Sequence, residues 1–179
     1  MLKTIGPGVK NKFLPIGYLN RMQRQQLIKL LTMQHSTTKF LEELAGKKLK
    51  VKLEFQRELY TTPDQLEIVR VTRLYLDDPQ SPVIYSITSL PKKDLKPKEI
   101  EDIKDGNIPL GRVFKLTERK GFRKSRITIQ TIRDERMSKR LNVLGTWFFA
   151  KEYCLWVGNR RIGNIKEIFN EESFLRIWS

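Results

Sequence analysis

The sequence has one cysteine and one histidine among its 179 residues. Cys154 alone cannot form an internal disulfide, and with His35 as the sole imidazole we expect no zinc site built from His and Cys. No apolar run approaches the length needed to span a bilayer, and the N-terminus lacks the charged-then-apolar pattern of a secretory signal. We therefore expect a soluble cytoplasmic protein with no metal and no membrane partner.

Several nucleotide and redox motifs are also missing. The chain has no Gly-x-Gly-x-x-Gly, no phosphate loop ending in Gly-Lys-Ser/Thr and no Cys-x-x-Cys. It also has no internal repeat, no low-complexity tract and no linker that would divide it. We expect a single domain over 1–179, with residues 1–17 as an irregular arm.

What the chain does have is positive charge: 35 Lys and Arg against 20 Asp and Glu, a net charge of +15. This charge favours an anionic partner, whether nucleic acid, a membrane surface, or a carboxylate or phosphate metabolite. The lysines are scattered, as on a solubilising surface, and the aromatic residues between 147 and 156 are poorly interleaved with arginine. We therefore do not expect a nucleic-acid partner, although a basic nucleic-acid binder stays open as an alternative.

The hydrophobic periodicity predicts an α+β fold. Helical spacing and capping residues predict helices over roughly 21–33, 36–45 and 97–104. In the first of these, Met22, Leu27, Leu30 and Leu31 are expected to form the buried stripe. Alternation with a period of two, broken by turn residues, predicts strands near 48–56, 66–76, 83–90, 125–132, 146–157 and 160–169. Strands joined mostly by hairpins imply one antiparallel sheet with helices packed on it.

The stretch from Gly106 to Phe114 is a candidate for binding. Gly106 ends a helical pattern, Pro109 cannot continue one, and Gly111 permits a backbone bend that a side chain would block. Such a bend could bring backbone N–H groups and the Leu110 side chain close to a small ligand. The alternative is a helix stop followed by a surface turn.

Two isolated charges support a buried site. Arg73 and Glu167 each lie between apolar residues on one face of a predicted strand. Buried charges need partners, so the two could pair with each other or reach water at strand ends. In the functional alternative, Arg73 binds a carboxylate through its planar guanidinium, and Glu167 holds or moves a proton in a water-poor cavity.

Five short motifs resemble the chorismate–pyruvate lyase family, in its diverged archaeal and bacterial branch. The resemblance runs from about Ser36 to Phe169, and its motifs are modestly specific singly and much more so in this order and spacing. They are Ser-Thr-Thr-Lys at 36–39, Arg-Leu-Tyr-Leu at 73–76, Ser-Leu-Pro at 89–91, Ile-Pro-Leu-Gly-Arg at 108–112 and Lys-Glu-Ile-Phe at 166–169.

The resemblance implies a six-stranded antiparallel sheet with helices on one side, enclosing a ligand pocket. It also implies a cofactor-free elimination that converts chorismate to 4-hydroxybenzoate and pyruvate. By position, Arg73 would bind the ring carboxylate, Leu110 would offer its backbone N–H beside Gly111, and Glu167 would transfer a proton at the far end of the ring. Thr37 stands where relatives place a pocket methionine.

The sequence departs from the family pattern at two places. Ile87 stands where the family has an arginine on its third strand, and Lys151-Glu152 replaces a paired arginine on the penultimate strand. Arg112, Arg126 or Lys151 could compensate. We therefore expect a lyase or a close relative acting on an aromatic or pre-aromatic carboxylate. The alternative is a non-catalytic ligand-binding module similar to the effector domains of GntR-type regulators. Oligomeric state is left open.

Overall fold

The computed structural model describes residues 19–116 and 122–178, which form a single six-stranded antiparallel sheet with helices packed on it. The expected arm at 1–17 lies outside these residues. The strand order is β1-β2-β3-β6-β5-β4, which confirms the predicted α+β class. The strand bounds are β1 Lys50–Thr62, β2 Gln65–Tyr75, β3 Ile84–Pro91, β4 Phe122–Arg133, β5 Trp147–Val157 and β6 Arg160–Phe169.

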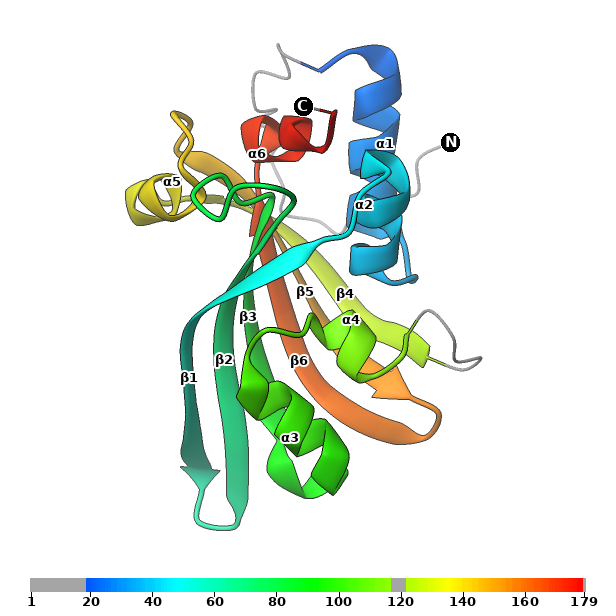
Figure 1. Cartoon of the computed structure of the whole chain (residues 1–179), viewed down its shortest axis with the longest axis vertical. Helices are drawn as coiled ribbons and strands as arrows, with labels where there is room; N and C mark the ends of the chain where they lie inside the picture. The colour runs from blue at the N-terminus through cyan, green and yellow to red at the C-terminus, as the bar shows by residue number, and fades with distance from the viewer. Residues whose placement is uncertain (1–18, 117–121, 179) are drawn as a thin grey trace, which may run out of the picture.

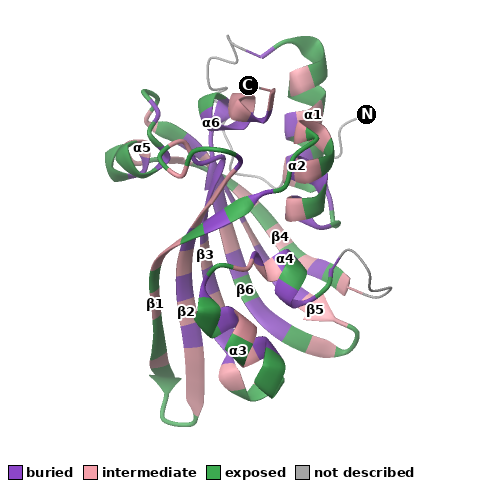
Figure 2. Ribbon diagram, in the orientation of Figure 1, coloured by how far each residue is buried: buried purple, intermediate pink, exposed green. Residues whose placement is uncertain are grey.

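Short reversals build the sheet from neighbouring strands. β1 and β2 form one hairpin, and β5 and β6 form another around Gly158, whose φ of 61° suits glycine. The two halves meet where β3 pairs with β6. The far end of the β1–β2 hairpin is largely exposed, whereas buried residues follow the central strands (Figure 2).

One face of the sheet, here called the inner face, is covered by α1 Arg21–Thr32, α2 Thr37–Ala45, α3 Pro97–Asp105, α4 Leu110–Val113 and α6 Glu171–Leu175 (Figure 1). Capping explains the helix ends. The side chains of Asn20 and Ser36 accept hydrogen bonds from backbone N–H groups in the first turns of α1 and α2, and Gly46 and Gly106 end α2 and α3 in the left-handed conformation.

The opposite face, here called the outer face, is covered at one end by α5 Glu135–Leu141. Met137 and Leu141 of α5 pack with Tyr85, Phe148 and Ile168 in one apolar cluster. Short 3₁₀ helices at Lys92–Asp94 and Arg176–Trp178 complete the elements of the described chain.

Two apolar clusters fill the inner face, and the site lies between them. One packs α1, α2 and α6 around Leu30, Leu41 and Phe169, and the other packs α3 and α4 around Ile103 and Phe114. The predicted stripe of α1 was wrong at Met22, which is 54% exposed. The buried residues of α1 are Leu27 and Leu30, so the buried stripe is narrower than the predicted one.

Candidate functional site

A cavity of about 50 Å³ lies between the starts of α2 and α4 and the inner face of the sheet. Polar side chains from the start of α2 and from β2, β3, β4, β5 and β6 line this cavity together with apolar residues. The polar lining residues are Ser36, Thr37, Thr38, Arg70, Thr72, Ser86, Lys124, Tyr153 and Glu167, and the others are Val51, Leu74, Pro109, Leu110, Gly111, Leu116, Leu155 and Ile165.

Arg70 of β2 is the main cationic group of the cavity, and it is 1% exposed. Its Nη2 donates to the carbonyl oxygens of Gly106 at 2.6 Å and Ile108 at 3.0 Å, just before α4. Its Nε and Nη1 are buried and have no hydrogen-bond partner among the described residues. Burial lowers the pKa of Arg70 to about 10, while Asp105 opposes that shift, so the guanidinium is charged at neutral pH. Two buried N–H donor groups are thus available to a ligand.

Glu167 of β6 is held in place by hydroxyl groups on both of its oxygens. The Tyr153 hydroxyl donates to Oε1 at 2.9 Å, and the Thr37 hydroxyl donates to Oε2 at 3.0 Å. Burial and the nearby Glu167 charge raise the pKa of Tyr153 well above its usual range, so the phenol stays protonated and remains a donor. These contacts join β5, β6 and the N-terminus of α2 at one point of the cavity.

Two buried lysines lie beside this carboxylate. Lys124 of β4 donates to the Thr37 hydroxyl at 2.8 Å, and its ammonium lies 4.4 Å from the Tyr153 ring centre. Lys151 of β5 donates to the carbonyls of Leu30 at 2.7 Å and Met33 at 3.2 Å, at the end of α1. Burial lowers the pKa of Lys124, and burial together with the charge of Lys124 lowers the pKa of Lys151 to about 8.

The site has more positive than negative charge. Arg70, Lys124 and Lys151 are each less than 5% exposed, and among the described residues that line the cavity Glu167 is the one carboxylate. Unbalanced buried charge is costly, so an anion placed beside Arg70 and Lys124 would be stabilised by both. The electrostatics of the cavity therefore favour a small anionic ligand.

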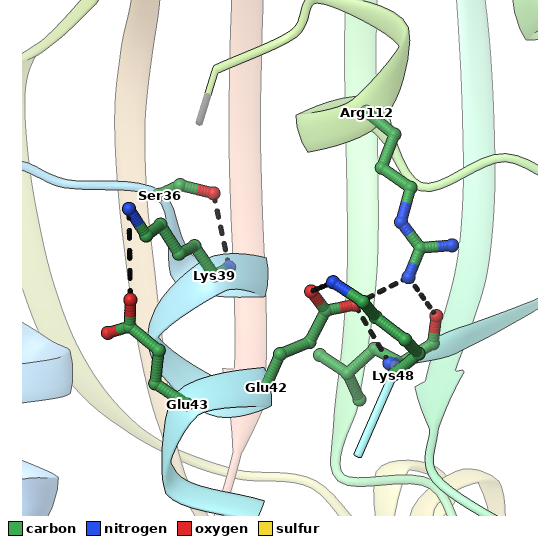
Figure 3. A network of polar contacts seen from close by, with 7 residues as sticks. Ser36, Lys39, Glu42, Glu43, Lys48 and Arg112 are labelled. Carbon is green, nitrogen blue, oxygen red and sulfur yellow. Dashed lines mark hydrogen bonds and ion pairs between the residues drawn. The ribbon is translucent and has the colours of Figure 1, made fainter. Parts of the chain in front are cut away.

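A surface network fixes α4 against α2 beside the cavity (Figure 3). Arg112 of α4 donates to the Glu42 carboxylate and, at 3.1 Å, to the Leu49 carbonyl, while Leu49 N–H donates to Glu42 at 3.0 Å. Burial opposes ionisation of Glu42, but its bonds to Arg112, Leu49 and Lys48 outweigh it and lower the pKa of Glu42. The ion pair therefore joins two elements that line the cavity.

We expect Glu42→Gln to lower the free energy of unfolding by about 1–3 kcal/mol at pH 7, because Arg112 loses its charged partner. Since the folded pKa of Glu42 is depressed, its contribution is present above the unfolded pKa and is lost as pH falls through the folded value. Urea unfolding at pH 7 and at acid pH measures both effects.

Glu43→Gln is the matched control for this prediction. Glu43 lies on the same helix and pairs with Lys39 at 3.7 Å, and both side chains are more than half exposed. Such exposed pairs contribute little, so the control should be nearly neutral. Equal effects of the two substitutions would show that Glu42 does not tie α4 in place.

The structure brings four of the five predicted site residues to the cavity: Thr37, Leu110, Gly111 and Glu167. Leu110 and Gly111 occupy the first turn of α4, where backbone N–H groups have no partner within the helix. Gly111 is helical and makes no unusual bend. A Cβ there would lie 3.1 Å from the Thr38 hydroxyl, so its small size allows α4 to approach α2. The ligand roles of these four residues stay predictions.

The placement of Arg73 in the cavity was wrong. Arg73 lies on the outer side of β2 and contacts Glu54 of β1, which also pairs with Arg140 at 3.4 Å. Residues three apart on a strand lie on opposite faces, so Arg70 faces the cavity and Arg73 faces away from it. The guanidinium expected opposite Glu167 is therefore that of Arg70.

The residues singled out as departures from the family pattern also separate by face. Ile87 packs in the outer cluster beneath α5, while its neighbours Ser86 and Thr88 are buried toward the inner face. Lys151 is buried at the inner face beside Lys124, whereas Glu152 pairs with Lys166 at 2.6 Å on the outer face. Of the compensating cations suggested from sequence, none lines the cavity, and Lys151 is the one that is buried beside Lys124.

Sequence reasoning missed Arg70, Lys124 and Tyr153. For Arg70 a signal was present, because it alternates with Ile68 and Thr72 on a face that proves to be buried. For Lys124 no such signal existed, since a β-bulge between Ser125 and Thr128 breaks the alternation of β4. Among the described residues, no group of His, Cys, Asp and Glu is arranged to hold a metal, and no helix could cross a membrane.

No family model and no curated protein matches the sequence. Solved structures do match. PhnF from Mycobacterium smegmatis is similar over 83% of this chain and 77% of its own, with 15% identity and a TM-score of 0.56. The C-terminal domain of the histidine utilization repressor from Pseudomonas syringae covers 68% of this chain and 91% of its own, with 11% identity and a TM-score of 0.50.

A third similar structure is a ligand-binding domain assigned to a GntR-family transcriptional regulator of Bordetella bronchiseptica. It covers 69% of this chain and 83% of its own, with 12% identity and a TM-score of 0.50. Identities this low show the fold alone. The chain thus has the chorismate lyase-like fold found in the C-terminal domains of GntR-family regulators.

Proposed function

We propose that this protein is a ligand-binding domain whose cavity takes a small organic carboxylate, bound by Arg70. The observation that carries the proposal is the pair of buried Arg70 N–H groups, on Nε and Nη1, without a partner among the described residues. A carboxylate oxygen accepts a charge-assisted hydrogen bond from a guanidinium N–H group of this kind. The Bordetella domain of the same fold is described as ligand-binding, which supports this reading over catalysis.

The cavity size limits which ligand fits the present geometry. A volume of about 50 Å³ is small beside the several hundred Å³ of most ligand pockets. A two- or three-carbon acid matches it more closely, whereas an aromatic acid such as 4-hydroxybenzoate requires the cavity to widen. Widening at α4 would have to overcome the contact between Arg112 and Glu42 that holds this turn against α2.

Paired acids and amides test the proposal directly. We expect 4-hydroxybenzoate or pyruvate to raise the melting temperature, and the matching amides, 4-hydroxybenzamide and pyruvamide, to leave it unchanged. Isothermal titration then gives the affinity of the acid that binds best. Equal shifts with acid and amide, or no shift with either acid, would overturn the carboxylate site.

A second candidate is the lyase reaction, in which chorismate yields 4-hydroxybenzoate and pyruvate. It is favoured by Glu167, a carboxylate that lines the same cavity as Arg70 and could move the proton released when the ring becomes aromatic. Incubation with chorismate, followed by chromatography for both products, tests it. Product formation no faster than in buffer would rule it out, and Glu167→Gln should abolish any acceleration.

A further inference from the structure

A second and larger cavity lies on the outer face of the sheet, at the end that α5 does not cover. This outer groove measures about 610 Å³ and runs across β3, β6, β5 and β4. The lining residues that matter here are Ser125, Arg126, Glu152, Trp156, Arg161 and Lys166. It is separate from the carboxylate cavity, because Arg70, Lys124 and Glu167 face the other side.

Pairing across three strands places a tryptophan between two arginines, one on each neighbouring strand. Arg123 of β4 pairs with Trp156 of β5, and Trp156 pairs with Arg161 of β6. The Arg123 guanidinium lies 4.8 Å from the Trp156 ring centre, and the indole N–H donates to the Ser125 hydroxyl at 3.0 Å. The ring is therefore fixed at the groove with a flat cation stacked near it.

Arg126 is held at the groove by an unusual backbone. Its φ is 54°, a left-handed value that costs a non-glycine residue energy, and it lies within the β-bulge of β4. A bulge redirects a side chain relative to the regular strand. This places a third arginine at the rim beside Trp156, where the side chain is exposed.

These arginines are not neutralised within the described chain. Glu152, the carboxylate in the groove, already pairs with Lys166 at 2.6 Å. Arg161 donates to the Asn164 amide oxygen at 3.2 Å, and the ion pairs among residues 19–116 and 122–178 include none from Arg123, Arg126 or Arg161. The groove and the neighbouring Arg123 thus offer three guanidinium groups without an ion pair around one aromatic ring.

We propose that the outer groove binds single-stranded nucleic acid, with a base stacked at Trp156 and Arg123 and with phosphates contacting Arg126 and Arg161. Guanidinium groups suit phosphate, and an aromatic ring with a stacked arginine suits an unpaired base. A duplex would present phosphates but no base face to Trp156. An acidic peptide would satisfy the arginines but would not use the ring.

Fluorescence anisotropy with labelled oligo(U) and oligo(dT) of about fifteen nucleotides, a matching duplex and poly-glutamate tests this proposal. We expect a single strand to bind more tightly than the duplex or poly-glutamate. Arg126→Ala with Arg161→Ala should weaken binding at least about tenfold and reduce the salt dependence by roughly one to two released counterions. Trp156→Leu should weaken binding without changing that salt dependence.

Arg21→Ala with Arg57→Ala is the control, because it removes the same charge from two exposed residues outside the groove. It should leave affinity within about threefold, which distinguishes a site from general attraction to net charge. Equal losses in both double variants, preference for the duplex, or equal binding of poly-glutamate would overturn the proposal. Melting temperatures verify that each variant is folded, and carboxylate binding in the inner cavity should be unaffected.

Discussion

Arg70→Lys is expected to reduce carboxylate affinity by about thirtyfold or more, the largest effect on binding that we predict. Lysine keeps the charge but loses the N–H groups that the guanidinium holds in fixed directions, and a truncated buried charge contact typically costs about 2–5 kcal/mol. The residue is 1% exposed, so water cannot replace the lost N–H groups. Titration of the best-binding acid into wild type and variant measures the change.

Arg73→Ala is the control for this experiment, because Arg73 contacts Glu54 on the outer face rather than the cavity. We expect its carboxylate affinity to lie within about threefold of wild type. The two variants compare Arg73, which the sequence predicted as the carboxylate-binding residue, with Arg70, which lines the cavity in the structure. If Arg73→Ala lost the ligand and Arg70→Lys retained it, the assigned site would be wrong.

Lys151→Met is expected to change how stability depends on pH. Burial, followed by the charge of Lys124, lowers the pKa of Lys151 to about 8, against about 10.4 for an unfolded lysine. Between these two pKa values the unfolded chain binds a proton that the folded chain does not. The free energy of unfolding of the wild type therefore rises with pH over this range. The variant lacks this gain, which could reach a few kcal/mol.

Urea unfolding of wild type and Lys151→Met at pH 7 and pH 10 measures how much the free energy of unfolding changes with pH in each protein. Subtracting the two changes removes the contribution of groups that titrate in both proteins. Lys139→Met, an exposed position on α5, should give the same pH dependence as wild type. A parallel dependence in Lys151→Met and wild type would refute the buried lysine with a lowered pKa.

A bound anion near Lys151 favours its charged form, so carboxylate affinity should fall as pH rises above about 8.

Most elements of the fold follow from local sequence. Asn20, Ser36, Gly46 and Gly106 mark helix ends, and the alternating stretches around Gly158 predict the β5–β6 hairpin that forms. These signals are local because caps and turns involve residues only a few positions apart. Glu167 was also predictable, since a carboxylate on an apolar strand face must find partners when it is buried.

The cationic half of the site did not follow from sequence. Alternation separates the two faces of β2 but does not say which one the helices cover, so it could not show that Arg70, rather than the predicted Arg73, faces the interior. The bulge in β4 similarly hides from the sequence which face Lys124 takes, and a bulge has no fixed sequence mark. The Arg123–Trp156–Arg161 row spans three strands and is invisible along the chain.

By itself, then, the sequence determined α1, α2 and α3 but not α4, α5 or α6, together with the strands, their hairpin pairing and one acidic group that needed a buried partner. Tertiary structure decided which face became the interior, and with it that Arg70, Lys124 and Tyr153 join Glu167 at the cavity. The reason is physical. Local patterns record which residues share a face, whereas the choice of the covered face depends on helices that pack from distant parts of the chain.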